Sequence, residues 1–384
     1  MTEIWTQHNQ VDLLENGAAY FPALQAAIDA AEQIVYLQTY IFAEDAIGRA
    51  VATTLVAAAR RGVTVRVMVD GFGTRHLSPE WVGGMKAAGV EWLIFHPEHS
   101  RFSLRRYRLR RMHRKVVVVD NRLAFIGGIN IIDDMNAFRP PRHDYAVRVQ
   151  GEVVRQIADD VRRLWIFVAW VHGYAAHEEH VTTAADAVRI GEEKTAYVVR
   201  DNLRYRWDIE EAYLSAIASA TQTVLIANAY FLPGLRFRRA LMEAAQRGVE
   251  VILLLQWQPD HRLLQYATQA WYGRLLASGV KICEFHRGFL HAKVAVIDGH
   301  WATVGSSNID PFSLLLAREA NLLIDSPRFA AELSAALQRT IHNGGKWVEE
   351  DGWRKRPWYQ QILPYLTMLL MRGLMGLLGY GQNW

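Results

Sequence analysis

The chain has 384 residues, of which 51% are hydrophobic and 21% are charged, and this balance excludes an intrinsically disordered chain. Its formal net charge of +4 is mildly basic, which favours anionic partners such as lipid headgroups or nucleic acid without choosing between them. The single cysteine, Cys283, excludes an internal disulfide and fits a reducing compartment.

The first predicted elements alternate between helix and strand. Apolar residues at helical spacing predict a helix over Ala23–Ala31, and a strand follows at Ile34–Phe42. A second helical pattern stops at Gly62, which we expect to take a positive φ just past the helix end. The next strand, Val63–Val69, is rich in valine and typical of a strand buried on both faces. This order predicts an α/β sandwich.

The same order recurs near the middle of the chain. A helix is predicted over Ile209–Ala220, then a strand at Val224–Phe231, a helix stop at Gly248 and a buried strand at Val249–Leu255. Two such α/β sandwich domains predict a pseudo-two-fold dimer within one chain. We place the domains at residues 1–175 and 195–345, with a polar, alanine-rich linker at 176–194 and a tail at 346–384.

Each repeat runs on to an H-x-K-x4-D motif. The first copy reads MHRKVVVVD and the second LHAKVAVID. Alternation along a strand puts the histidine and lysine on one sheet face, while the aspartate falls where the strand turns. Because the full motif occurs twice at equivalent places, we expect both copies to meet in one active site. The six residues are His113, Lys115, Asp120, His291, Lys293 and Asp298.

Small and amide residues follow each motif. A second strand, Leu123–Ile126 or Ala302–Val304, ends in a pair of small residues, and an asparagine comes two residues later. Small residues allow the backbone to approach a phosphoryl group closely, and asparagine amides donate hydrogen bonds to it. The predicted phosphate-binding and supporting residues are Gly128, Ser306, Asn130 and Asn308.

This set of side chains suits transfer at a phosphodiester. Two histidines supply a nucleophile and a general acid that later acts as a base. The two lysines neutralise the non-bridging oxygens, so we expect no metal and no other cofactor. We expect Asp120 and Asp298 to hold their neighbours in geometry within the catalytic set.

These residues resemble those of the phospholipase D superfamily, and within it the strings LLENG, RRMHRK and HWATVGSSN resemble the bacterial cardiolipin synthases, most closely their B type. The resemblance implies transfer of a phosphatidyl group between two phosphatidylglycerol molecules through a phosphatidyl-histidine intermediate. It further implies His113 as the nucleophile and His291 as the acid and base. Simple phospholipid hydrolysis and nuclease activity are the alternatives.

The resemblance also implies a further acid that tunes each histidine. Glu319 lies 28 residues past His291, and Asp144 lies 31 residues past His113. Each would orient the imidazole of its own half and stabilise its cationic form. The alternative for both is a solvent-exposed acid.

Three further residues near strand ends stay outside the predicted catalytic set. Asp70 suits a site residue or a turn cap equally well. We expect Tyr40 and Tyr230, which follow corresponding strands one position out of register, to pack in the core rather than line the cleft.

Two segments outside the motifs suggest a membrane. The segment Arg101–Lys115 holds seven arginines interleaved with apolar residues, which favours a lipid-binding rim over a solvated loop or a nucleic-acid contact. In the tail, an uncharged stretch Pro357–Met371 precedes Arg372, and we expect Ile362–Trp384 to be an in-plane membrane anchor rather than a spanning helix or a helix packed on the body. The expected partners are phosphatidylglycerol and an anionic membrane surface, without nucleic acid. The protein would attach peripherally, on the cytoplasmic face.

Overall fold

The computed structural model describes residues 3–97, 110–136, 141–174, 189–201, 205–257, 262–311, 313 and 316–377. Most of the expected linker at 176–194 lies outside the described residues. So do residues 98–109 of the basic segment and residues 378–384 at the end of the tail.

The first half alternates strands and helices in the predicted order. Its elements are β1 (Trp5–Glu15), α1 (Asn16–Asp29), β2 (Ile34–Thr39), α2 (Ala46–Arg60), β3 (Thr64–Asp70), α3 (Pro79–Ala87), β4 (Glu91–Phe95), β5 (Lys115–Val119), β6 (Leu123–Gly127), β7 (Arg142–His143), β8 (Tyr145–Gln150) and α4 (Val153–Val171).

The second half repeats this order and is followed by the tail. Its elements are β9 (Glu193–Arg200), α5 (Asp208–Ser219), β10 (Thr223–Asn228), α6 (Leu235–Gln246), β11 (Glu250–Gln256), α7 (Arg262–Gln269), α8 (Tyr272–Ala277), β12 (Lys281–Phe285), β13 (Phe289–Leu290), β14 (Lys293–Ile297), β15 (Trp301–Gly305), β16 (Glu319–Asp325) and α10 (Pro327–Gly344). The tail contains β17 (Gly345–Trp347), α11 (Glu350–Arg354) and α12 (Trp358–Leu377).

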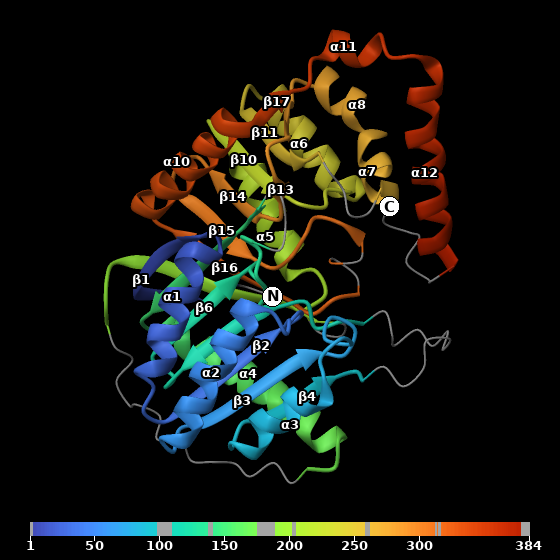
Figure 1. The fold of residues 1–384 in the computed structure, drawn as a ribbon. Coiled ribbons are helices and arrows are strands. Elements are labelled where there is room, and N and C mark those ends of the chain that lie inside the picture. The colour runs from blue at the N-terminus through green and yellow to red at the C-terminus, as the bar shows by residue number, and fades with distance from the viewer. Residues whose placement is uncertain are drawn as a thin grey trace.

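The two halves share one sheet of 15 strands, in the order β17-β12-β11-β10-β14-β15-β16-β9-β1-β8-β6-β5-β2-β3-β4 (Figure 1). The order is symmetric about the antiparallel pair β1–β9, so β1 corresponds to β9 and β8 to β16. This confirms the predicted α/β fold with two repeated halves. The sequence patterns did not predict β1 and β9, the two strands that join the halves.

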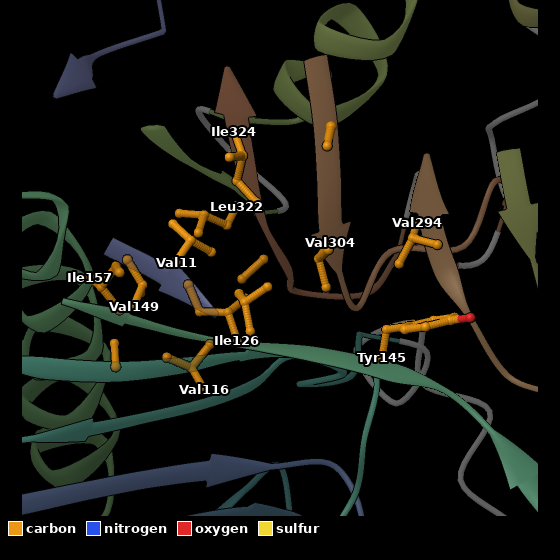
Figure 2. Packing of buried hydrophobic residues seen from close by; sticks show 14 of the residues in the cluster. Val11, Val116, Ile126, Tyr145, Val149, Ile157, Val294, Val304, Leu322 and Ile324 are labelled. Atoms are coloured by element: carbon orange, nitrogen blue, oxygen red, sulfur yellow. The ribbon is translucent and has the colours of Figure 1, made fainter. Parts of the chain in front are cut away.

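The halves also share a hydrophobic core. Strands of the first half contribute Val116, Ile126 and Val149, and these face Val304 and Leu322 from the second half (Figure 2). All five side chains are buried, and each side chain of this kind stabilises the fold by about 1.5–3 kcal/mol. A relative movement of the halves would expose this core, so they form one packed unit.

The helix stops follow the prediction, whereas one helix start does not. Gly62 has φ 95° and Gly248 has φ 91°, a backbone conformation that glycine adopts without steric cost. Helix α1 begins at Asn16, seven residues before the predicted start at Ala23. Pro22 lies inside this helix. Because proline normally interrupts a helix, the sequence pattern did not predict the turns that precede it.

Helix α12 lies along the second half and packs one face against α7 (Figure 1). Met371 on this face is buried against Leu264 and Ala267. The opposite face exposes Ile362, Leu363, Tyr365, Leu366, Leu369 and Leu370. None of the described helices combines the length and the apolar character needed to cross a bilayer.

Candidate active site

Backbone hydrogen bonds between the halves bring the two motifs together. The N–H of His113 donates to the carbonyl of Arg318 over 3.0 Å, and the N–H of His291 donates to the carbonyl of His143 over 2.7 Å. The short parallel pair β7–β13 extends the second contact. Each histidine therefore lies two residues before its own strand, β5 or β14, while the other half holds its backbone.

Glu319 is the partner of His113. Nδ1 of His113 lies 2.9 Å from Oε1 of Glu319, and the hydroxyl of Ser306 donates to Oε2 over 2.5 Å. Burial opposes ionisation of Glu319, but His113, Lys115 and the Ser306 hydroxyl outweigh it and hold its pKa below the ordinary value. Burial lowers the pKa of His113, so its imidazole is neutral near pH 7.

Asp144 is the partner of His291. Nδ1 of His291 lies 2.6 Å from Oδ2 of Asp144 and 2.8 Å from Nζ of Lys293. Burial raises the pKa of Asp144 to about 6, and burial together with Lys293 lowers the pKa of His291 well below its ordinary value. A side chain at Gly128 would put its Cβ 2.3 Å from Oδ1 of Asp144, so only glycine leaves room for this carboxylate.

The carboxylates are exchanged relative to the expectation from sequence. We expected Asp144 to orient His113 and Glu319 to orient His291, each within its own half. The structure pairs each carboxylate with the histidine of the other half. Neither acid is exposed, because Glu319 is 0% and Asp144 is 2% accessible.

The two lysines lie beneath the histidines. Nζ of Lys115 donates to the carbonyl of His113 over 2.5 Å, and Lys293 donates to the carbonyl of His291. Both side chains are buried, and burial lowers the pKa of Lys115 to about 7 and that of Lys293 to about 8. Buried cations at these positions attract an anion that enters between the histidines.

The asparagines complete the walls of the same cleft, which encloses about 640 Å³. Oδ1 of Asn130 accepts from the N–H of Ile41 over 3.1 Å. Asn308 is also buried and lies on the second-half side of the cleft. The cleft is lined by both histidines, both asparagines, Tyr40, Tyr230, Arg111, Arg142 and an apolar set that includes Ile41, Phe72, Leu263, Leu264 and Met371.

The expectation that Tyr40 and Tyr230 pack in the core is wrong. Both line the cleft, and the ring of Tyr40 lies edge-on to the ring of His113 at a centroid distance of 4.9 Å. Tyr230 lies 6.5 Å from the ring of His291.

The motif aspartates, which we expected to hold their neighbours in geometry within the catalytic set, lie away from the histidines. Asp120 and Asp298 follow the far ends of β5 and β14, where each takes a positive φ. Asp120 accepts from the N–H groups of residues 32–34, and Asp298 from those of residues 221–223. Each aspartate is five residue steps from the motif lysine along an extended strand, at about 3.3 Å per step. Each aspartate therefore holds the backbone at the start of a neighbouring strand, β2 or β10, and does not position a reacting group.

Asp70 positions the segment that leads to His113. Its buried carboxylate accepts from the N–H of Met112 and of Phe72, each over 2.9 Å, and lies 3.6 Å from Arg111. Its place at the end of β3 was the sequence signal for this role. Arg142 had no sequence signal, because no motif includes it.

The described arginines of the basic segment Arg101–Lys115 lie in different environments. Residues 101–109 lie outside the described residues. Arg110 is exposed, Arg111 lines the cleft, and Arg114 is 2% accessible and ion-paired with Asp160. Arg114 therefore does not belong to a lipid-binding rim. Within the part of the chain that the structure describes, no group of three or more His, Cys, Asp or Glu side chains is placed to hold a metal ion.

Comparison with known proteins identifies relatives along nearly the whole chain. The sequence matches the family described as "Cardiolipin synthase, PLD-like domain" over residues 24–165 and 213–341. It is 40% identical to cardiolipin synthase B of Salmonella typhimurium and 39% identical to that of Escherichia coli, with 98% of this chain and 91% of each relative covered. The structure of phosphatidylserine synthase from Haemophilus influenzae shares the fold, with a TM-score of 0.72 at 13% identity, covering 97% of this chain and 95% of that one.

Proposed function

The chain belongs to the family of cardiolipin synthases with phospholipase D-like domains, and we propose that it transfers a phosphatidyl group from one phosphatidylglycerol to another, releasing glycerol. The observation that carries this proposal is the single cleft in which His113 and His291 meet, each with a buried carboxylate from the other half. The apolar part of the cleft wall suits a lipid substrate.

His113 is the nucleophile in this proposal. An ionised carboxylate only accepts hydrogen bonds, so Glu319 holds the hydrogen of neutral His113 on Nδ1. The lone pair of Nε2 is then available to attack phosphorus. The new P–N bond forms as the P–O bond to glycerol breaks, and Lys115 and Lys293 stabilise the charge on the non-bridging oxygens.

His291 is the acid and then the base. Burial raises the pKa of its partner Asp144 to about 6, whereas the pKa of Glu319 is held below its ordinary value, so Asp144 takes up a proton at a higher pH than Glu319 does. Nε2 of His291 gives this proton to the departing glycerol oxygen. In the second step Nε2 takes the proton of the acceptor hydroxyl, whose oxygen attacks phosphorus while the P–N bond breaks.

The exposed apolar face of α12 docks on the bilayer in this proposal. Met371 lines the cleft from the opposite face of the same helix, so α12 contributes both to the cleft wall and to the docking face. An amphipathic helix of this kind lies in the plane of the membrane, next to the lipids that would enter the cleft. The attachment is peripheral and, in accord with the free Cys283, on the cytoplasmic face.

Labelled phosphatidylglycerol tests this function. Purified protein in vesicles should form cardiolipin and free glycerol, and His113→Ala and His291→Ala should each abolish both products. Phosphatidic acid as the sole lipid product would show hydrolysis instead of transfer. Near-normal activity in either single variant would refute the shared site.

A further inference from the structure

Two arginines among the described residues line the cleft, and they differ in their surroundings. Arg111 lies two residues before His113, and its guanidinium lies 3.6 Å from the buried carboxylate of Asp70. Arg142 lies beside the second motif, because β7 pairs with β13 and sets Arg142 opposite Phe289. The guanidinium carbon of Arg142 lies 5.0 Å from the centre of the Phe289 ring.

Arg142 is therefore a neighbour of His291. The ring of Phe289 stacks on the ring of His291 at a centroid distance of 6.2 Å. The charge of Arg142 lies close enough to add to the effect of burial in lowering the pKa of His291 and of Lys293. Nε of Arg142 lies 3.7 Å from Oδ1 of Asp134, and the side chain is only 12% accessible, so the guanidinium is largely enclosed by protein.

The second step of the proposed reaction brings a second phosphate into the cleft. While the first phosphate is bonded to His113, the acceptor phosphatidylglycerol presents its hydroxyl to His291. The acceptor's own phosphate lies three carbons from that hydroxyl, so it must sit on the His291 side of the cleft. A phosphate there requires a cation, and a guanidinium suits it because its N–H groups match two phosphate oxygens.

We propose that Arg142 binds the phosphate of the acceptor lipid and thereby selects phosphatidylglycerol over water and simple alcohols. This inference rests on the proposed function, in which His291 activates the acceptor. The Phe289 ring and Asp134 hold the guanidinium in place before the acceptor arrives. Arg142 is a specificity residue for the second step, and its influence on the pKa of His291 and Lys293 is common to all acceptors.

Competition between two acceptors tests the inference. The enzyme would be given labelled phosphatidylglycerol in detergent micelles with a fixed concentration of ethanol, and the ratio of cardiolipin to phosphatidylethanol would be measured. Both products arise from the same intermediate, so the ratio does not depend on how fast that intermediate forms. Arg142→Gln should lower the ratio about tenfold or more, as expected for the loss of a charge-assisted contact. Arg142→Lys should lower it less.

Arg111→Gln is the matched control, since it removes the other of the two arginines that the structure describes in the cleft wall. Its ratio should stay within about twofold of the wild-type ratio, whatever its total rate. An unchanged ratio in Arg142→Gln, an equal fall in Arg111→Gln, or complete loss of both products in Arg142→Gln would each overturn the inference. A wild-type enzyme that forms phosphatidylethanol but no cardiolipin would reject the proposed function itself.

Discussion

Nδ1 of His113 lies 2.9 Å from Oε1 of Glu319, which is 206 positions further along the chain and belongs to the other half. The reciprocal pair, His291 and Asp144, is 147 positions apart. Each half therefore carries a histidine without its carboxylate and a carboxylate without its histidine. The packed interface between the halves is part of the catalytic apparatus.

Glu319→Gln should lower kcat by about 10²- to 10⁴-fold, because the uncharged amide no longer fixes the tautomer of His113. The side chain keeps its size, so the thermal unfolding temperature should change little. Glu210→Gln, which replaces another buried carboxyl group of the second half, is the control and should leave kcat within a few fold. A kcat of Glu319→Gln close to that of the wild type would contradict the role of this carboxylate.

Asp298→Ala should reduce stability rather than chemistry. It removes an acceptor of three backbone N–H groups and should destabilise the fold by about 1–3 kcal/mol. Asp298→Asn keeps one acceptor oxygen and should lose less. At a temperature well below unfolding, kcat of both variants should stay within a few fold of the wild-type value. A loss comparable to that of His291→Ala would return Asp298 to the catalytic set.

The pH dependence of kcat/KM should be bell-shaped, since this parameter reports the free enzyme. The acid limb reflects protonation of His113, which removes the lone pair that attacks phosphorus. Because the pKa of His113 is lowered, this limb should lie below the ordinary pKa of histidine. The alkaline limb should fall between about pH 6 and 8, because the pair of His291 and Asp144 loses its proton above about 6, and Lys115 and Lys293 lose their charge above their pKa values of about 7 and about 8.

Lys115→Arg is the diagnostic variant for the alkaline limb, because arginine stays charged across this range. In this variant the component near 7 should disappear, while those near 6 from Asp144 and near 8 from Lys293 remain, even where the rate itself is lower. An alkaline limb that does not move would show that Lys115 does not control it.

The repeated order of helices and strands was predictable because apolar periodicity reports it directly. The two motifs were predictable because strand alternation fixes the relation of His113 to Lys115. The exchange of Glu319 and Asp144 was not predictable from spacing. It depends on the pair β7–β13 and on contacts across the halves, which local sequence does not encode.

The environment of single residues was the other feature that the sequence did not predict. Tyr40 follows the end of β2, and an aromatic residue there suits a core and a cleft wall equally well. Asp120 belongs to the motif by sequence, yet the length of an extended strand carries it away from His113. Arg142 lies outside every motif and reaches the cleft through tertiary pairing alone.

The docking face of α12 gives a membrane-binding prediction. Leu366→Glu combined with Leu369→Glu puts two charges on this face, where both side chains are 58% accessible. The affinity for phosphatidylglycerol-containing vesicles, measured by sedimentation, should fall by at least about tenfold. Full burial of one leucine side chain contributes about 1.5–3 kcal/mol, and the double variant loses two. Trp170→Glu, at an exposed apolar residue of α4 in the other half, is the control and should bind normally. Unchanged sedimentation of the double variant would exclude α12 as the docking face.

The division of roles between the histidines is tested most directly by locating the covalent intermediate. Enzyme turning over labelled phosphatidylglycerol would be quenched under conditions that preserve the P–N bond, digested and analysed by mass spectrometry. The phosphatidyl group should be found on the peptide that contains His113, and His113→Ala should carry none. A phosphatidyl group on the peptide that contains His291 would contradict the assignment of nucleophile and acid.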